Sequence, residues 1–209
     1  MFKMRVKLVL LVLLFPFLLS ATHIIKNDLL KPEASKMIET MADELLSKTG
    51  INGYLVATNE NFPEKFNLVE YSKKYESSIS KPYVMLIFAP NATITKKSEQ
   101  KGRVAIIASS KGLEILYDKS DILDATIDII AVKDKNSIED KYNIGIVQGF
   151  SELADQIASS KDIKMETTIP NDTKIIFRIL ETIVVIGAVL VFWIFFFKPL
   201  YMRIKNGKQ

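Results

Sequence analysis

The apolar residues of this chain fall into two long runs near its ends, at Leu8–Leu19 and Ile175–Phe197. Between these runs, apolar positions recur at the spacings of amphipathic helices and of buried strands. Such a pattern is typical of a water-soluble domain held between two apolar segments. We therefore expect a folded domain over residues 25–160 and a linker over residues 161–174.

Four stretches of the domain have the spacing of helices. Residues 31–50 have Pro32 at their second position, which suits a first helical turn, and end at Gly50, a common helix stop. Their expected apolar stripe consists of Ala34, Met37, Ile38, Met41, Ala42 and Leu45. A second helix is expected over residues 64–79. A third follows Lys111, with apolar positions at Leu113, Leu116, Ile122, Leu123, Ile127 and Ile130. The fourth and longest is expected over residues 137–161, with Tyr142, Ile146, Phe150, Leu153 and Ile157 on one face.

Strands are expected at residues 51–58, 83–89 and 102–109, with a polar connection over Asn91–Lys101. The second strand, "YVMLIFA", is apolar throughout and so reads as fully buried. The last two strands have no helix between them, which favours an antiparallel pair inside a mixed sheet. The predicted fold class is α/β, a three-layer α/β/α sandwich with a small mixed sheet, followed by a C-terminal transmembrane helix.

The two ends predict export and anchoring. Residues 1–22 combine Lys3, Arg5 and Lys7 with a short apolar run, as in a signal peptide or a signal anchor. Residues 175–197 number 23, which as a helix is about 34 Å and exceeds the ~30 Å hydrocarbon core of a bilayer. Near the start of this span, Arg178 and Glu181 form a candidate pair at the membrane interface.

Charge sets the expected topology. The tail, residues 198–209, holds four Lys or Arg and no acid, so the positive-inside rule places it in the cytoplasm. The domain would then lie in the periplasm, anchored in a bacterial inner membrane. Residues 23–174 carry a net charge of −3, which does not suit nucleic-acid binding. The chain has no cysteine and one histidine, His23, which argues against thiol, zinc–cysteine and Ser-His-Asp chemistry.

One group of carboxylates is the candidate site. Glu114, Asp118, Asp121 and Asp124 follow the third predicted strand, and Asp128 continues the series. They are open to three interpretations: a catalytic site, a site for Ca²⁺ or Mg²⁺ bound through oxygen ligands, or the solvated face of an amphipathic helix.

Four stretches together resemble the TPM-domain family: "LLSKTGINGYLVAT", "KPYVMLIFAP", "GRVAIIASSKGLEILYD" and "KYNIGIVQGFSELADQIA". The most specific element is Gly112-Leu113-Glu114 followed by Asp118, and the spaced Gly145 and Gly149 come next. The resemblance implies a secreted α/β/α domain between a signal peptide and a transmembrane helix. Members of the family include plant thylakoid proteins with acid phosphatase activity and photosystem-repair roles, and a nematode receptor accessory protein.

The chain departs from the family pattern at its acids. Lys81, Pro82 and Tyr83 stand where the family commonly has Asp-Asn-Gly, and Asp140-Lys141-Tyr142 stands where it has Gly-Asp-Tyr. Fewer acids favour a domain that binds or assists another membrane protein complex. The alternative function is that of a divalent-metal-dependent acid phosphatase-like hydrolase.

Overall fold

The computed structural model describes residues 22–97, 100–170, 172–198 and 201, without the side chains of residues 172–181. The chain divides into two compact units, residues 1–169 and residues 170–209, and each is described by itself. The predicted signal segment, residues 1–22, lies outside the described residues apart from Thr22.

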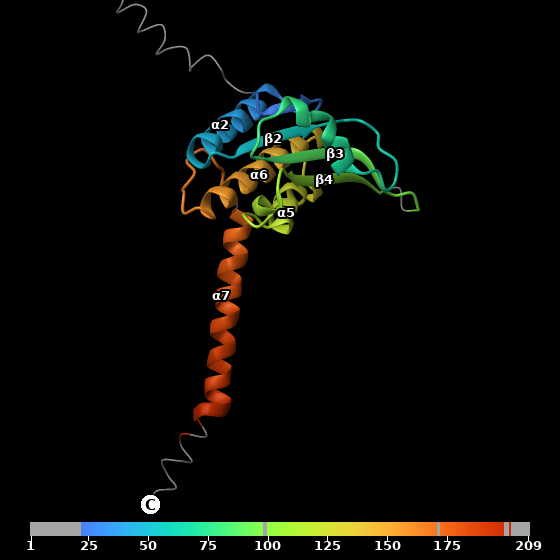
Figure 1. Ribbon diagram of the computed structural model, residues 1–209. Helices are drawn as coiled ribbons and strands as arrows, with labels where there is room; N and C mark the ends of the chain where they lie inside the picture. Colours follow the sequence, from blue (N-terminus) through green and yellow to red (C-terminus); the bar gives the residue numbers. More distant parts are fainter. Residues whose placement is uncertain (1–21, 98–99, 171, 199–200, 202–209) are drawn as a thin grey trace, which may run out of the picture. The chain divides into compact units, whose positions relative to one another are not determined.

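The first unit is built on a four-stranded mixed sheet (Figure 1). Its strands are β1 (Ile24–Asn27), β2 (Asn52–Ala57), β3 (Tyr83–Thr95) and β4 (Gln100–Ala108), in the spatial order β1-β2-β3-β4. The pairs β1–β2 and β2–β3 are parallel, and β3–β4 is antiparallel, as predicted for the last two strands. Strand β1 is not predicted by the local pattern.

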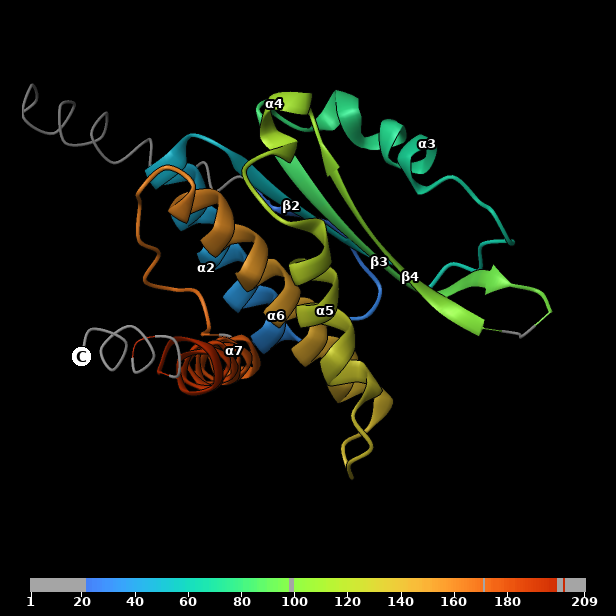
Figure 2. The ribbon, with the colours of Figure 1, turned by 90° about the horizontal axis from the view of Figure 1, so that it is seen from below.

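Helices cover both faces of this sheet. On one face lie α2 (Pro32–Thr49), α5 (Lys119–Ala131) and α6 (Ile138–Ser159) (Figure 2). Their apolar side chains form one core with Leu55 and Leu86. On the other face, α3 (Leu68–Ser72) and the 3-10 helix η2 (Lys73–Ser78) pack near Val56 and Ile87. The alternation of side chains along each strand supplies both cores. The predicted α/β class with a mixed sheet is confirmed.

Helix ends follow the local sequence closely. Helix α2 begins at Pro32 and stops at Gly50, whose φ of 73° is the left-handed conformation that glycine adopts without strain. Helix α6 is capped by Ser137, whose hydroxyl accepts a hydrogen bond from the N–H of Asp140 at 3.1 Å. The Ser137 hydroxyl also donates to the Asp140 carboxylate at 2.7 Å, so the two residues form a variant of a capping box.

Several expectations are corrected. The helix predicted over residues 64–79 is only α3 and η2, because Asn67 caps a new helix at Leu68. Strand β3 continues through Pro90 to Thr95, so the polar stretch after residue 90 is mostly hairpin strand. Met37, expected in the buried stripe of α2, is 42% exposed, because the stripe that faces the sheet is narrower.

The second unit contains α7 (Asp172–Phe192), followed by a π-helical turn, η3 (Trp193–Phe197). Within the residues that the structure describes, no helix combines the length and the apolar composition needed to cross a membrane. The candidate interface pair, Arg178 and Glu181, falls among the side chains outside the described part of the chain.

Candidate functional site

The carboxylate series is divided between two helices. Glu114 ends the short helix α4 (Lys111–Glu114), and α5 begins at Lys119. Between them the chain runs non-helically through Ile115 to Asp118, which is the N-cap of α5. The interval from Glu114 to Asp118 is therefore not one continuous helical face.

Asp118 is used to start α5. Its carboxylate accepts hydrogen bonds from the N–H of Ser120 at 2.8 Å and of Asp121 at 3.4 Å, and from the Ser120 hydroxyl at 2.6 Å. These bonds satisfy N–H groups that have no partner inside the first helical turn. The negative charge also lies at the positive end of the helix dipole.

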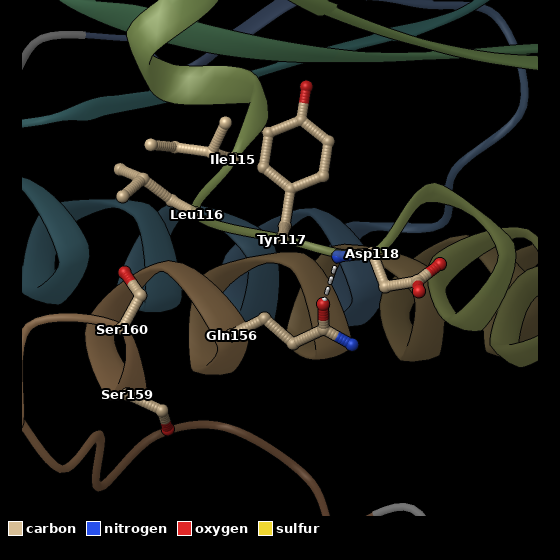
Figure 3. A pocket seen from close by; sticks show the side chains of 7 residues that line it. All are labelled: Ile115, Leu116, Tyr117, Asp118, Gln156, Ser159 and Ser160. Atoms are coloured by element: carbon tan, nitrogen blue, oxygen red, sulfur yellow. Dashed lines mark hydrogen bonds between the residues drawn. The ribbon is translucent and has the colours of Figure 1, made fainter.

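Gln156 of α6 joins this turn to the helix beside it. Its side-chain oxygen accepts a hydrogen bond from the backbone N–H of Asp118 at 2.7 Å (Figure 3). Its side-chain nitrogen donates to Glu152 at 2.6 Å and to Asp121 at 3.2 Å. One amide thus holds the start of α5 and two carboxylates in place. The sequence analysis missed Gln156, because no local spacing relates it to Asp118, 38 residues earlier.

The structure does not gather all four predicted cation ligands. Glu114 is exposed and lies 3.9 Å from the ammonium of Lys119, and Asp124 is exposed on α5. Across residues 22–97, 100–170 and 182–198, no group of three or more His, Asp or Glu side chains is arranged to hold a metal ion. Asp118 and Asp121 are the two members of the set that meet, through Gln156.

An open hollow of about 550 Å³ lies beside this turn. Its lining consists of Ile115, Leu116, Tyr117, Asp118, Gln156, Ser159 and Ser160 (Figure 3). Ile115, in the turn between α4 and α5, is 83% exposed. The hollow therefore presents an apolar side chain next to hydroxyl, amide and carboxylate groups.

Tyr117 is the buried member of this lining. Its hydroxyl has no hydrogen-bond partner among the described residues, and in Figure 3 it points away from Gln156 and Asp118. Burial, and then the charge of Glu114, raise the pKa of Tyr117 to about 12. Tyr117 is thus a neutral phenol at ordinary pH and packs as part of the core.

The sole histidine lies away from this hollow. His23 is fully buried, and its ring nitrogens contact Gly53 of β2 and Asp43 of α2. The hollow's own side chains offer hydrogen bonding and apolar contact.

Comparisons with known proteins leave the family open. No family model matches the chain, and no curated protein matches it. Among solved structures, the chain is similar to the N-terminal domain of a protein from P. gingivalis, determined by solution NMR. The TM-score is 0.49 at 13% sequence identity, over 70% of this chain and 88% of that chain.

Proposed function

We propose that this protein is a membrane-anchored, TPM-like periplasmic domain that binds another membrane protein and assists its complex. The observation that carries the proposal is the exposed apolar surface of the second unit. Every large apolar side chain from Ile183 to Phe197 is between 47% and 69% exposed. In water, an apolar surface of this extent is unfavourable by roughly 25 cal/mol for each Å², whereas lipid tails remove that cost.

The sequence around this surface supports a bilayer as its environment. The whole apolar run of the sequence, residues 175–197, has the length that a spanning helix needs. The basic tail after it favours a cytoplasmic C-terminus. A single span then puts residues 25–160 on the outer side of a bacterial inner membrane.

The candidate site supports binding over hydrolysis. Asp118 caps α5, and Asp121 is tied to Gln156, so both carboxylates serve the local fold. Ile115 stands exposed beside them, and an apolar side chain in a polar rim suits contact with a protein surface. The Ca²⁺- or Mg²⁺-dependent phosphatase stays a prediction that no contact among the described residues favours.

The topology can be tested with single cysteines, because the natural chain has none. Lys36→Cys places a thiol on the exposed side of α2, and Lys205→Cys places one in the basic tail. A membrane-impermeant maleimide should label Lys36→Cys in cells whose outer membrane has been permeabilised, and Lys205→Cys only after the inner membrane is opened. The reverse labelling order, or labelling of both variants at once, would reject the anchored periplasmic domain.

Partner binding can be tested at the hollow. A photoreactive phenylalanine analogue at Ile115, in the full chain in its own membrane, should give an adduct with a membrane protein. The same analogue at Thr40, an exposed position on α2, is the matched control. Equal adducts at both positions, or none at Ile115, would count against the hollow as a contact surface.

A further inference from the structure

Strand β4 has an open edge. It is the last strand in the order β1-β2-β3-β4, so within the described part of the chain no strand lies on its outer side (Figure 2). The contrast in burial agrees with this position: residues 83–89 of β3 are at most 3% exposed, while residues 103–108 of β4 are all partly exposed. A strand at such an edge presents backbone N–H and C=O groups that can pair with another strand.

The register identifies which groups face outward. Ser109 donates its N–H to the carbonyl of Tyr83 at 2.9 Å, so this pair faces inward. In an antiparallel ladder, hydrogen-bonded and non-hydrogen-bonded pairs alternate. Because residues 103–108 pair one to one with residues 84–89, the backbone groups of Val104, Ile106 and Ala108 point away from β3.

Natural sheets protect their edges with charges, bulges or proline. On β4 these features are confined to its beginning. Lys101 and Arg103 supply charge, Gly102 has a φ of 106°, and the register with β3 shifts between Ala89 and Thr93. The five residues that follow, Val104–Ala108, are regular, apolar and without proline, so this part of the edge is unprotected.

We propose that Val104–Ala108 is a docking edge, onto which an extended, acid-bearing segment of a partner protein adds as a fifth strand. Backbone hydrogen bonds to Val104, Ile106 and Ala108 would hold the segment, as in other cases of strand addition. Acidic side chains of the segment would lie near Lys101 and Arg103, which fix its position along the edge. The inference rests on the proposed function and adds a partner-binding surface to the hollow beside Ile115.

Charge complementarity decides against a second copy of this chain as the occupant. Strand β4 carries two cations and no acid, and Lys111 follows it closely. Two β4 edges paired antiparallel around Ile106 would bring Lys101 of one copy toward the end of the other copy's strand, where Lys111 begins α4. Like charges brought close together repel, whereas an acid near Lys101 is favourable.

The test uses the full chain in detergent micelles and a short fluorescein-labelled peptide that alternates valine and threonine and has glutamate at both ends. Two comparison peptides carry lysine at both ends or have the sequence of β4 itself. The glutamate peptide is expected to bind, measured by fluorescence anisotropy, more tightly than either comparison peptide. Absence of binding, or tighter binding of the β4 peptide, would overturn the proposal; the second result would indicate self-association.

A matched pair of variants at Ile106 tests whether the peptide binds at the open edge of β4. Ile106→Pro removes an outward N–H, and proline is tolerated at edge positions whose N–H faces solvent. Ile106→Val has as many side-chain carbons as proline but keeps the N–H. Binding is expected to weaken about tenfold or more in Ile106→Pro and to persist in Ile106→Val. Equal affinities of the two folded variants would overturn the edge as the site.

A second variant covers the case in which Ile106→Pro fails to fold. Lys101 is exposed, so Lys101→Glu should leave the fold intact and, with only Arg103 left as a cation on the strand, should remove the preference for the glutamate peptide over the lysine peptide. An unchanged preference would reject the charge argument. These peptide measurements do not depend on membrane topology or on Ile115. The docking-edge proposal can therefore be rejected while the proposed function stands, and the proposed function can be rejected while the docking edge stands.

Discussion

The imidazole of His23 lies 3.1 Å from the carboxylate of Asp43, although His23 is completely buried. The other ring nitrogen lies 3.1 Å from the carbonyl oxygen of Gly53. Two acceptors, one on α2 and one on β2, therefore hold the residue that precedes β1. The single histidine of the chain attaches the start of the domain to its core.

His23→Phe should destabilise the first unit, because phenylalanine keeps the ring but leaves the buried carbonyl of Gly53 without a donor. We expect a loss of about 1–3 kcal/mol in the free energy of unfolding, measured by urea titration followed by circular dichroism. Asp43→Asn, which keeps an acceptor oxygen on the exposed side, is the control and should cost less. Unchanged stability in His23→Phe would contradict the attachment role.

Gly145→Ala should separate α5 from α6. A β-carbon at Gly145 would lie 2.6 Å from the carbonyl oxygen of Thr126 and 3.0 Å from Ile130, and a backbone oxygen cannot move without moving its helix. We expect a loss of about 1–3 kcal/mol in stability, as for other overpacked cores. Gly112→Ala is the control, since its β-carbon would meet only the Ser110 hydroxyl at 4.0 Å. A neutral Gly145→Ala would show that the helices can shift freely.

The carboxylate of Glu44 should make the free energy of unfolding depend on pH in the acidic range. Burial alone would raise its pKa, but the Lys48 ammonium, the Thr167 hydroxyl and the N–H groups of Glu166 and Thr167 together lower it to about 2. Its folded pKa is thus below the ordinary value of 4.5, so the stability it contributes is present above about pH 4.5 and is lost as the pH falls toward 2.

The variant Glu44→Gln isolates this contribution. The difference in unfolding free energy between the natural chain and Glu44→Gln should be on the order of 1–2 kcal/mol near neutral pH and should shrink between pH 4.5 and pH 2. The measurement is urea unfolding at a series of pH values. A difference that stays constant over this window would show that the carboxylate charge does not hold residues 166–167 against α2.

Asp118 separates the structural interpretation of the site from the catalytic one. Asparagine caps helices nearly as well as aspartate, so Asp118→Asn should cost little, whereas Asp118→Ala should cost about 1 kcal/mol in unfolding free energy. In the presence of Mg²⁺ or Ca²⁺, the rate of phosphomonoester hydrolysis measured with either variant should equal the rate measured with the natural chain. Turnover by the natural chain that disappears in Asp118→Asn would instead favour the phosphatase.

Local sequence determined the elements whose signals lie within a few residues. Pro32 and Gly50 mark the two ends of α2, and Ser137 with Asp140 starts α6, because capping depends on neighbours along the chain. The apolar run from Tyr83 likewise indicates a buried central strand. The antiparallel partner of that strand follows from the short connection between them.

Only the tertiary structure decided the features that depend on distant pairings. Strand β1 is four residues long and forms because β2 lies beside it, and Gln156 reaches Asp118 because α6 packs on α5. The open edge of β4 likewise follows from the strand order. Spacing along the chain indicates which residues share a face of one element. Which elements become neighbours depends instead on the packing of the whole core. The candidate site and the docking edge both depend on these neighbours, so local sequence could not predict them.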